Sequence, residues 1–234
     1  MRMLFALGVL FMAMLPEMAT AVTADDPFEA VMASRAQAEA ADAAMLSPNH
    51  YAAAVKTLER ARREADSGRA TATLNQDINK ADNQFRSAIT AAQLAKTTFA
   101  GVIREREAAR SADAWRLVPE RWLKAEHDFS AATRRLEDGG LKSADELGIV
   151  AAGNYRDAQL QALRSRYLSS TRALLVEAER MKAARYAPQT LAEANAKLAK
   201  AESALAANRS QPEMAKPEIE TARLAAAHAL HLAT

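Results

Sequence analysis

Three prolines stand in similar surroundings, and their spacing limits what this chain can fold into. Pro119 follows Pro48 by 71 residues, and Pro188 follows Pro119 by 69 residues. A large side chain stands three positions after each proline, and alanines stand six and thirteen positions after it. In chain order these positions are Tyr51, Trp122 and Leu191, then Ala54, Ala125 and Ala194, then Ala61, Ala132 and Ala201. A period of about seventy residues predicts three similar structural units.

Apolar residues after each proline recur every three or four positions, which is the spacing of one helix face. Proline suits the first turn of a helix, and it disfavours helical geometry at the residue before it. We therefore expect a turn at Pro48, Pro119 and Pro188, each followed by a helix of about twenty residues. Gly68, Gly139 and Asn208 stand twenty positions after the prolines. Glycine and asparagine accept the left-handed conformation at a helix end, so these residues are predicted to end the three helices.

A further helix is expected after each of these ends. Capping-box spacing occurs at Thr73-x-x-Gln76, Ser143-x-x-Glu146 and Ser210-x-x-Glu213. The first two of these helices show no stop before the next proline, and only Gly101, Gly148 and Gly153 weaken the helical pattern. Residues upstream of Pro48 match residues upstream of Pro119, for example Phe28 with Phe99 and Asp42 with Asp113. The last helix of one unit is therefore expected to run into the next unit.

The predicted fold is all-α. It consists of tandem antiparallel three-helix bundles, with connectivity like that of spectrin repeats and long shared helices. The units would span 28–100, 101–167 and 168–234, each roughly 30 Å long in a rod on the order of 90 Å. A single compact helical bundle is the alternative, if the long helices break near Gly101 and near Gly148 or Gly153.

The first residues have the order of a secretory signal peptide. An apolar run at 3–15 follows Arg2, and small residues at Ala19-Thr20-Ala21 follow Pro16. A membrane-spanning helix needs about twenty apolar residues, and this run is shorter. Residues 1–21 are therefore predicted to be a cleaved signal peptide, with the mature chain beginning near Val22 or Asp25. The mature chain is expected to lack a transmembrane segment and to reside in the periplasm, with outer-membrane association as a further option.

Composition narrows the possible functions. The chain has no cysteine, which excludes a thiol nucleophile, a thiolate metal site and N-terminal lipid attachment. Its 31 basic and 29 acidic residues give a net charge of +2, so no strong field for nucleic acid is expected. Aromatic residues make up only 5% of a chain that is 50% hydrophobic and rich in alanine, which predicts narrow cores between closely packed helices.

Candidate catalytic and metal-binding residues are few. The four histidines are His50, His127, His228 and His231, and the last two share a helix face at a spacing of three. Zinc needs three or four ligands, so this pair is interpreted as solvated or packed. Paired carboxylates at Glu105/Glu107, Asp145/Glu146 and Glu177/Glu179 lie in charge-rich helical stretches, which favours ion-paired surfaces. We expect no enzyme, no cofactor and no metal site.

Two tryptophans and several arginine clusters complete the candidates. Trp115 and Trp122 flank Pro119 and are predicted to pack across that turn, with carbohydrate stacking as the alternative. The arginines could meet anionic envelope polymers, but acidic neighbours offset most of them. These clusters are Arg60/Arg62/Arg63, Arg104/Arg106/Arg110, Arg134/Arg135 and Arg164/Arg166.

The segment Ala183-Ala184-Arg185-Tyr186-Ala187-Pro188, with the spaced alanines and leucines that follow it, resembles an alanine-rich helical domain of unknown function from proteobacterial envelope proteins. The resemblance is clearest over 170–233 and weaker over 38–100 and 104–168. In many relatives the domain precedes an OmpA-like peptidoglycan-binding domain. This chain has no such α/β segment up to Thr234, so no peptidoglycan-binding residue is carried over, and the helical part supplies no catalytic residue.

Together these patterns predict a non-enzymatic structural or scaffold protein of the cell envelope. It would act as a helical spacer or interaction surface, with another envelope protein or a peptidoglycan-associated component as partner and no role for nucleic acid. The alternative function is a periplasmic peptide-binding, lipid-binding or chaperone-like module that uses grooves between the bundles.

Overall fold

The computed structural model describes residues 27–68 and 72–234, and the predicted signal peptide lies outside these ranges. Within them every regular element is a helix, so the prediction of an all-α fold is confirmed. The elements are α1 (Glu29–Ala40), α2 (Ala43–Leu46), α3 (Pro48–Asp66), α4 (Ala72–Thr98), α5 (Ala100–Ser111), α6 (Ala114–Leu117), α7 (Pro119–Glu137), α8 (Leu141–Arg180), α9 (Ala183–Tyr186), α10 (Pro188–Ala207), the 3₁₀ helix η1 (Pro212–Ala215) and α11 (Lys216–His231). None of these helices is both long and apolar enough to cross a membrane.

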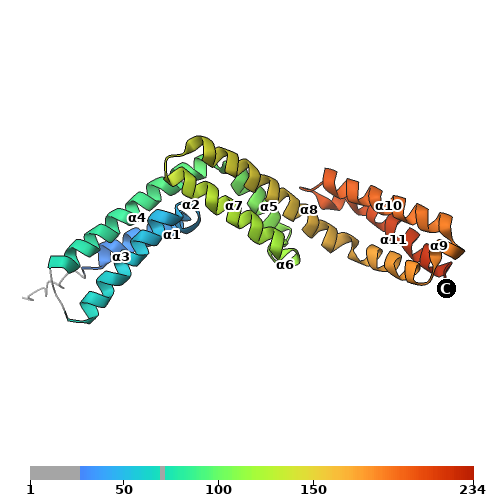
Figure 1. Ribbon diagram of the computed structural model, residues 1–234, viewed down its shortest axis with the longest axis horizontal. Coiled ribbons are helices and arrows are strands. Elements are labelled where there is room, and N and C mark those ends of the chain that lie inside the picture. The colour runs from blue at the N-terminus through green and yellow to red at the C-terminus, as the bar shows by residue number, and fades with distance from the viewer. Residues whose placement is uncertain (1–26, 69–71) are drawn as a thin grey trace, which may run out of the picture.

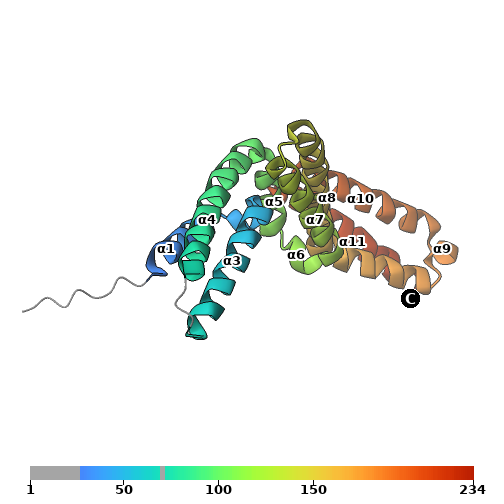
Figure 2. The same cartoon turned by 60° about the vertical axis from the view of Figure 1, so that its left-hand side comes forward.

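The helices pack in three successive groups that follow one another in an elongated row (Figure 1). The first group contains α1, α3 and α4, and the second contains α5, α7 and the first half of α8. The third contains the second half of α8 with α10 and α11. In each group the third helix packs against both of the others. Figure 2 shows from a second direction that the first group meets the second at an angle, which we call the elbow.

The same corner precedes each of the helices that begin at Pro48, Pro119 and Pro188. A non-glycine residue in the left-handed region comes first, then one helical turn, then an extended residue before the proline. The left-handed residues are Asp42, Asp113 and Lys182, with φ of 55°, 59° and 63°. Their spacings of 71 and 69 residues equal those of the prolines. The corner is therefore a repeated feature, although such a conformation is strained for residues with a Cβ.

The opposite turns differ from one another. Gly68 and Gly139 adopt left-handed conformations with φ of 70° and 79°. At α7 the Gly139 N–H donates to the Leu136 carbonyl and the Gly140 N–H to the Arg135 carbonyl, which is a Schellman motif. Asn208 also follows a helix end, but its φ is −114°, so its predicted left-handed conformation is wrong. Its side-chain amide instead donates to the Ala204 carbonyl at 2.9 Å, which satisfies a helix-end carbonyl without that conformation.

The three predicted capping boxes are also wrong, and Thr73 of the first already lies inside α4. Ser143 is the third residue of α8, and the residue before this helix is Gly140. Ser210 precedes η1 by two residues, and Gln211 occupies the cap position. Neither helix start has a side-chain cap. The Schellman motif explains the error at Ser143, because it brings the chain straight into α8 from Gly140.

Alanine dominates the narrow cores. The alanines six and thirteen positions after each proline are all fully buried, and between them lie Leu58 and Phe129, which are 2% and 1% exposed. Larger rings fill the remaining space. Tyr51 contacts Phe85 edge-on at a centroid distance of 5.8 Å, and Phe129 contacts Tyr155 at 6.3 Å. Close helix packing through alanine is therefore supplemented by a few aromatic contacts.

The two connections between the groups differ. Between the first and second groups the helix is interrupted at Phe99, where φ is −103° and ψ is 24°. Between the second and third groups α8 continues for 40 residues without a break. Gly148 and Gly153 both lie inside α8, so the break considered possible near them does not occur.

Candidate functional site

The elbow is closed by one carboxylate that reaches from the second group to the first. Glu137 is the last residue of α7, and its side chain is 3% exposed. Its Oε1 accepts hydrogen bonds from the Ser47 hydroxyl at 2.6 Å and from the His50 backbone N–H at 3.0 Å. Its Oε2 accepts a third from the Asn49 backbone N–H at 3.0 Å. Glu137 therefore caps the N-terminus of α3, which lies about ninety residues earlier in the chain.

The ring of His50 completes this arrangement. Its Nδ1 lies 2.6 Å from Glu137 Oε1. Burial acts to raise the pKa of Glu137, but the hydrogen bonds from the His50 N–H, the Ser47 hydroxyl, the Asn49 N–H and the His50 ring outweigh it. The net pKa of Glu137 is below its ordinary value. An ionised carboxylate only accepts hydrogen bonds, so Nδ1 of His50 must carry the hydrogen in this contact.

A second polar cluster lies beside the elbow within the second group. Arg106 donates from Nε and Nη2 to the two oxygens of Glu126, at 2.7 and 3.2 Å. The Tyr155 hydroxyl donates to Glu126 Oε1 at 2.7 Å, and Arg106 also lies over the ring of Trp122, 5.4 Å from its centroid. Burial, followed by the hydrogen bond to Glu126, raises the pKa of Tyr155 well above its ordinary value. Both carboxylate oxygens of Glu126 thus have partners within the cluster, which joins α5, α7 and α8.

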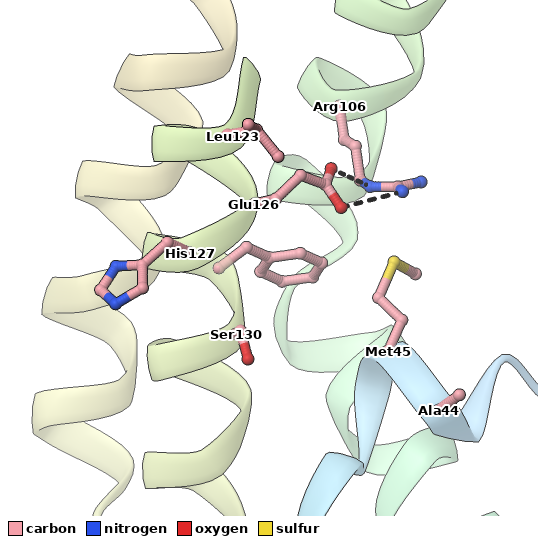
Figure 3. A pocket seen from close by; sticks show the side chains of 8 residues that line it. Ala44, Met45, Arg106, Leu123, Glu126, His127 and Ser130 are labelled. Carbon is pink, nitrogen blue, oxygen red and sulfur yellow. Dashed lines mark hydrogen bonds and ion pairs between the residues drawn. The ribbon is translucent and has the colours of Figure 1, made fainter. Parts of the chain in front are cut away.

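A hollow of about 520 Å³ opens between α2 and α7, next to this cluster (Figure 3). It is lined by Ala44, Met45, Arg106, Leu123, Glu126, His127, Phe129 and Ser130. Figure 3 shows Met45 on α2 facing the Arg106–Glu126 pair, while the ring of His127 points away from Met45. Leu123 is 65% exposed at the rim. Because Arg106 and Glu126 bind each other, the surface left for a ligand is mainly apolar.

Polar contacts between side chains also hold the second connection. Arg166, in the middle of α8, donates to Asp113 Oδ2 at 2.5 Å and to the Ala112 carbonyl at 3.3 Å. The Tyr167 hydroxyl donates to Glu213 at 2.8 Å. Arg209, after α10, donates to Gln159 at 2.9 Å and lies 3.6 Å from Glu105. Unlike Glu137, the charged members of these contacts are partly exposed, and each contact includes one residue of the continuous helix α8 or bridges groups beside it.

The predicted candidate residues do not come together. His228 and His231 lie on the last turns of α11, and no group of three or more potential ligands for a metal ion occurs in the described ranges. Glu177 pairs with Arg180 at 2.5 Å on an exposed face. The two tryptophans do not form the predicted contact, because Trp122 packs against Tyr155 at 5.6 Å and Trp115 is 53% exposed on α6.

The residues that were singled out as repeat positions lie at helix ends. Pro48, Pro119 and Pro188 begin α3, α7 and α10, and Gly68, Gly139 and Asn208 follow the ends of the same helices. Glu137 is not among the residues predicted from the sequence. The available signal was Ser47, a favoured cap residue directly before Pro48, but its partner is distant in sequence.

Comparisons with known proteins give no further assignment. No protein-family model matches the chain, and no curated protein or solved structure matches it either.

Proposed function

We propose that this protein is a non-enzymatic spacer or scaffold of the bacterial cell envelope, built from three tandem helical units that share their connecting helices. The observation that carries the proposal is the elongated row of helical groups in Figure 1. A spacer needs length and a fixed shape more than a reaction centre. The 40 residues of α8 alone correspond to about 60 Å.

The surfaces of the row support this role. Exposed ion pairs occur along single helices in all three groups, for example Arg86 with Asp82, Lys124 with Asp128 and Lys197 with Glu193. Such pairs add little stability individually, but they keep an extended helical surface well solvated. The partner would be another envelope protein or a peptidoglycan-associated component, recognised by a helical face or by one end of the row.

Small-angle X-ray scattering on the chain from Val22 onward tests the spacer role. We expect a maximum dimension on the order of 90 Å or more and the profile of an elongated particle. A compact chain of this length would have a radius of gyration of about 17 Å. A value near that figure would refute the proposal.

Export to the periplasm is tested separately. We expect N-terminal sequencing of the protein recovered from the periplasm of a Gram-negative host to begin near Val22 or Asp25. Recovery of an uncleaved chain from the cytoplasm would refute the envelope location, but it would leave the spacer geometry untouched.

The hollow between α2 and α7 favours a second candidate function, a peptide-binding or lipid-binding module. Its apolar rim at Met45 and Leu123 could accept an apolar side chain or an acyl chain. The fluorescent probe 8-anilinonaphthalene-1-sulfonate distinguishes the two functions. Saturable binding at one site that is lost in Leu123→Asp would favour the binding module. Absence of saturable binding would favour the spacer.

A further inference from the structure

Across the elbow the first and second groups share a continuous apolar core, and one buried carboxylate adds polar contacts to it. Besides the backbone connection at Phe99, the contact between the first and second groups consists of α2, α3 and α4 against α7. Glu137 lies in this contact, and four hydrogen bonds from Ser47, Asn49 and His50 of the first group converge on it. Ser47, which provides one of them, is itself fully buried.

We propose that Glu137 is a latch that fixes the angle of the elbow, and that protonation of its carboxylate releases the latch. The proposal adds regulation to the spacer function above and rests on that function for its biological use. The ionised carboxylate accepts every hydrogen bond offered to it. A protonated carboxyl group carries a hydrogen on one oxygen, so it can no longer accept all of these hydrogen bonds and at least one of them is lost.

Within the described ranges, Glu137 is the only carboxylate hydrogen-bonded to Ser47, Asn49 or His50. From α3 the titratable group facing Glu137 is His50, and the residues of α2 are not titratable. The charged neighbours on α7, α8 and α4 are exposed, and no ion pair joins any of them to Glu137 in the described ranges. They are Arg134 and Arg135 in the last turn of α7, Asp138 directly after it, Lys142 in the first turn of α8 and Lys96 in the last turn of α4. At the second connection the position equivalent to Glu137 is Ala206, so the latch has no counterpart there.

The direction of the pH effect follows from the hydrogen bonds. The pKa of Glu137 in the folded chain is lower than its ordinary value of 4.5. A depressed carboxyl pKa stabilises the folded arrangement above the unfolded value, and this stabilisation is lost as the pH falls through the folded value. The elbow should therefore be fixed at neutral pH and loosen below pH 4.5.

Distance measurements between two spin labels test the latch. The chain has no cysteine, so introduced cysteines label it specifically. Lys56→Cys on α3 and Arg156→Cys on α8 place exposed labels on either side of the elbow, and Arg156→Cys with Lys200→Cys on α10 forms a reference pair across the second connection. We expect Glu137→Gln to broaden the distance distribution of the first pair at pH 7 and to leave the reference pair unchanged.

The control is Glu177→Gln, which makes the same chemical change in an exposed pair of the third group. It should leave both distributions unchanged. Lowering the pH should broaden the distance distribution of the first pair more in the wild-type chain than in Glu137→Gln, because that variant already lacks the titrating carboxyl group. Glu137→Ala, which removes all four contacts, provides a stronger version of the same change.

If both Glu137 variants leave the width of the first pair's distance distribution unchanged, the proposal is overturned. Equal broadening of the reference pair would also overturn it, because the residue would then support general stability and not the elbow. A short distance between labels at Lys56→Cys and Lys200→Cys in the otherwise wild-type chain would count against the spacer function instead, so the two failures are distinguishable.

Discussion

The two connections between the helical groups occupy the same place in the repeat but are built differently. Phe99 and Leu168 are 69 residues apart, as are Asp113 and Lys182. At Phe99 the helix breaks, and the first group meets the second at the elbow. At Leu168 the helix continues, and α8 belongs to both the second and third groups.

The difference comes from a small number of side chains. The Phe99 ring lies edge-on to Phe129 at 5.7 Å and packs directly against the backbone of Gly148. Leu168, a smaller residue, packs with alanines such as Ala201 and Ala215. Thr97, Thr98 and Gly101 around Phe99 also have low helix propensity. A repeated pattern thus fixes where units meet, while individual residues decide whether the helix bends there.

The largest effect is expected where the elbow is packed. Phe99→Ala should lower the free energy of unfolding by about 3–5 kcal/mol, because it removes a fully buried ring and leaves a cavity. Leu168→Ala, the matched change at the second connection, should cost about 2–5 kcal/mol. Urea unfolding followed by circular dichroism measures both. A cost below about 1 kcal/mol for Phe99→Ala would contradict the packing role of this ring at the elbow.

An intermediate effect is expected at two glycines of the same helix. A Cβ added to Gly148 would lie 2.9 Å from Phe99 Cε1 and 3.0 Å from Cδ1, so Gly148→Ala should cost about 1–3 kcal/mol. Gly153 has open space at this position, so Gly153→Ala should stabilise α8 by about 0.5–1 kcal/mol. Thermal melts of the two variants should shift in opposite directions. Shifts of the same sign would show that Gly148 is not needed for the approach of Phe99.

The smallest effect is expected at the corners before the prolines. Lys182→Gly should stabilise the chain by about 0.5–1 kcal/mol, because relief of left-handed strain exceeds the added entropy of the unfolded chain. Asp113 has the same conformation but also binds Arg166, which a glycine would lose. Asp113→Gly should therefore give no gain. Chemical unfolding of both variants checks this, and an equal gain would show that the Asp113–Arg166 pair contributes nothing.

The local parts of this fold could be predicted from the sequence, and the long-range parts could not. Proline fixes its own φ and glycine permits left-handed conformations that other residues avoid, which is why α3 and α7 begin and end where their residue types indicate. Asp42 and Asp113 are 71 residues apart, as are Pro48 and Pro119, and this shared spacing marks them as repeat positions. Aspartate alone, however, does not require the left-handed conformation that both adopt. The cap provided by Glu137 depends on how two groups pack, and no local pattern specifies that.

The unbroken α8 also sets both the distance and the relative rotation between the second and third groups. Each residue of an α-helix adds about 1.5 Å and a rotation of about 100°. The number of residues between Tyr155 and Leu168 therefore sets both the distance between the second and third groups and the direction in which the third group faces. Inserting one residue there would turn α10 and α11 by roughly a quarter of a circle. Inserting seven would lengthen the row by about 10 Å and nearly restore the original facing.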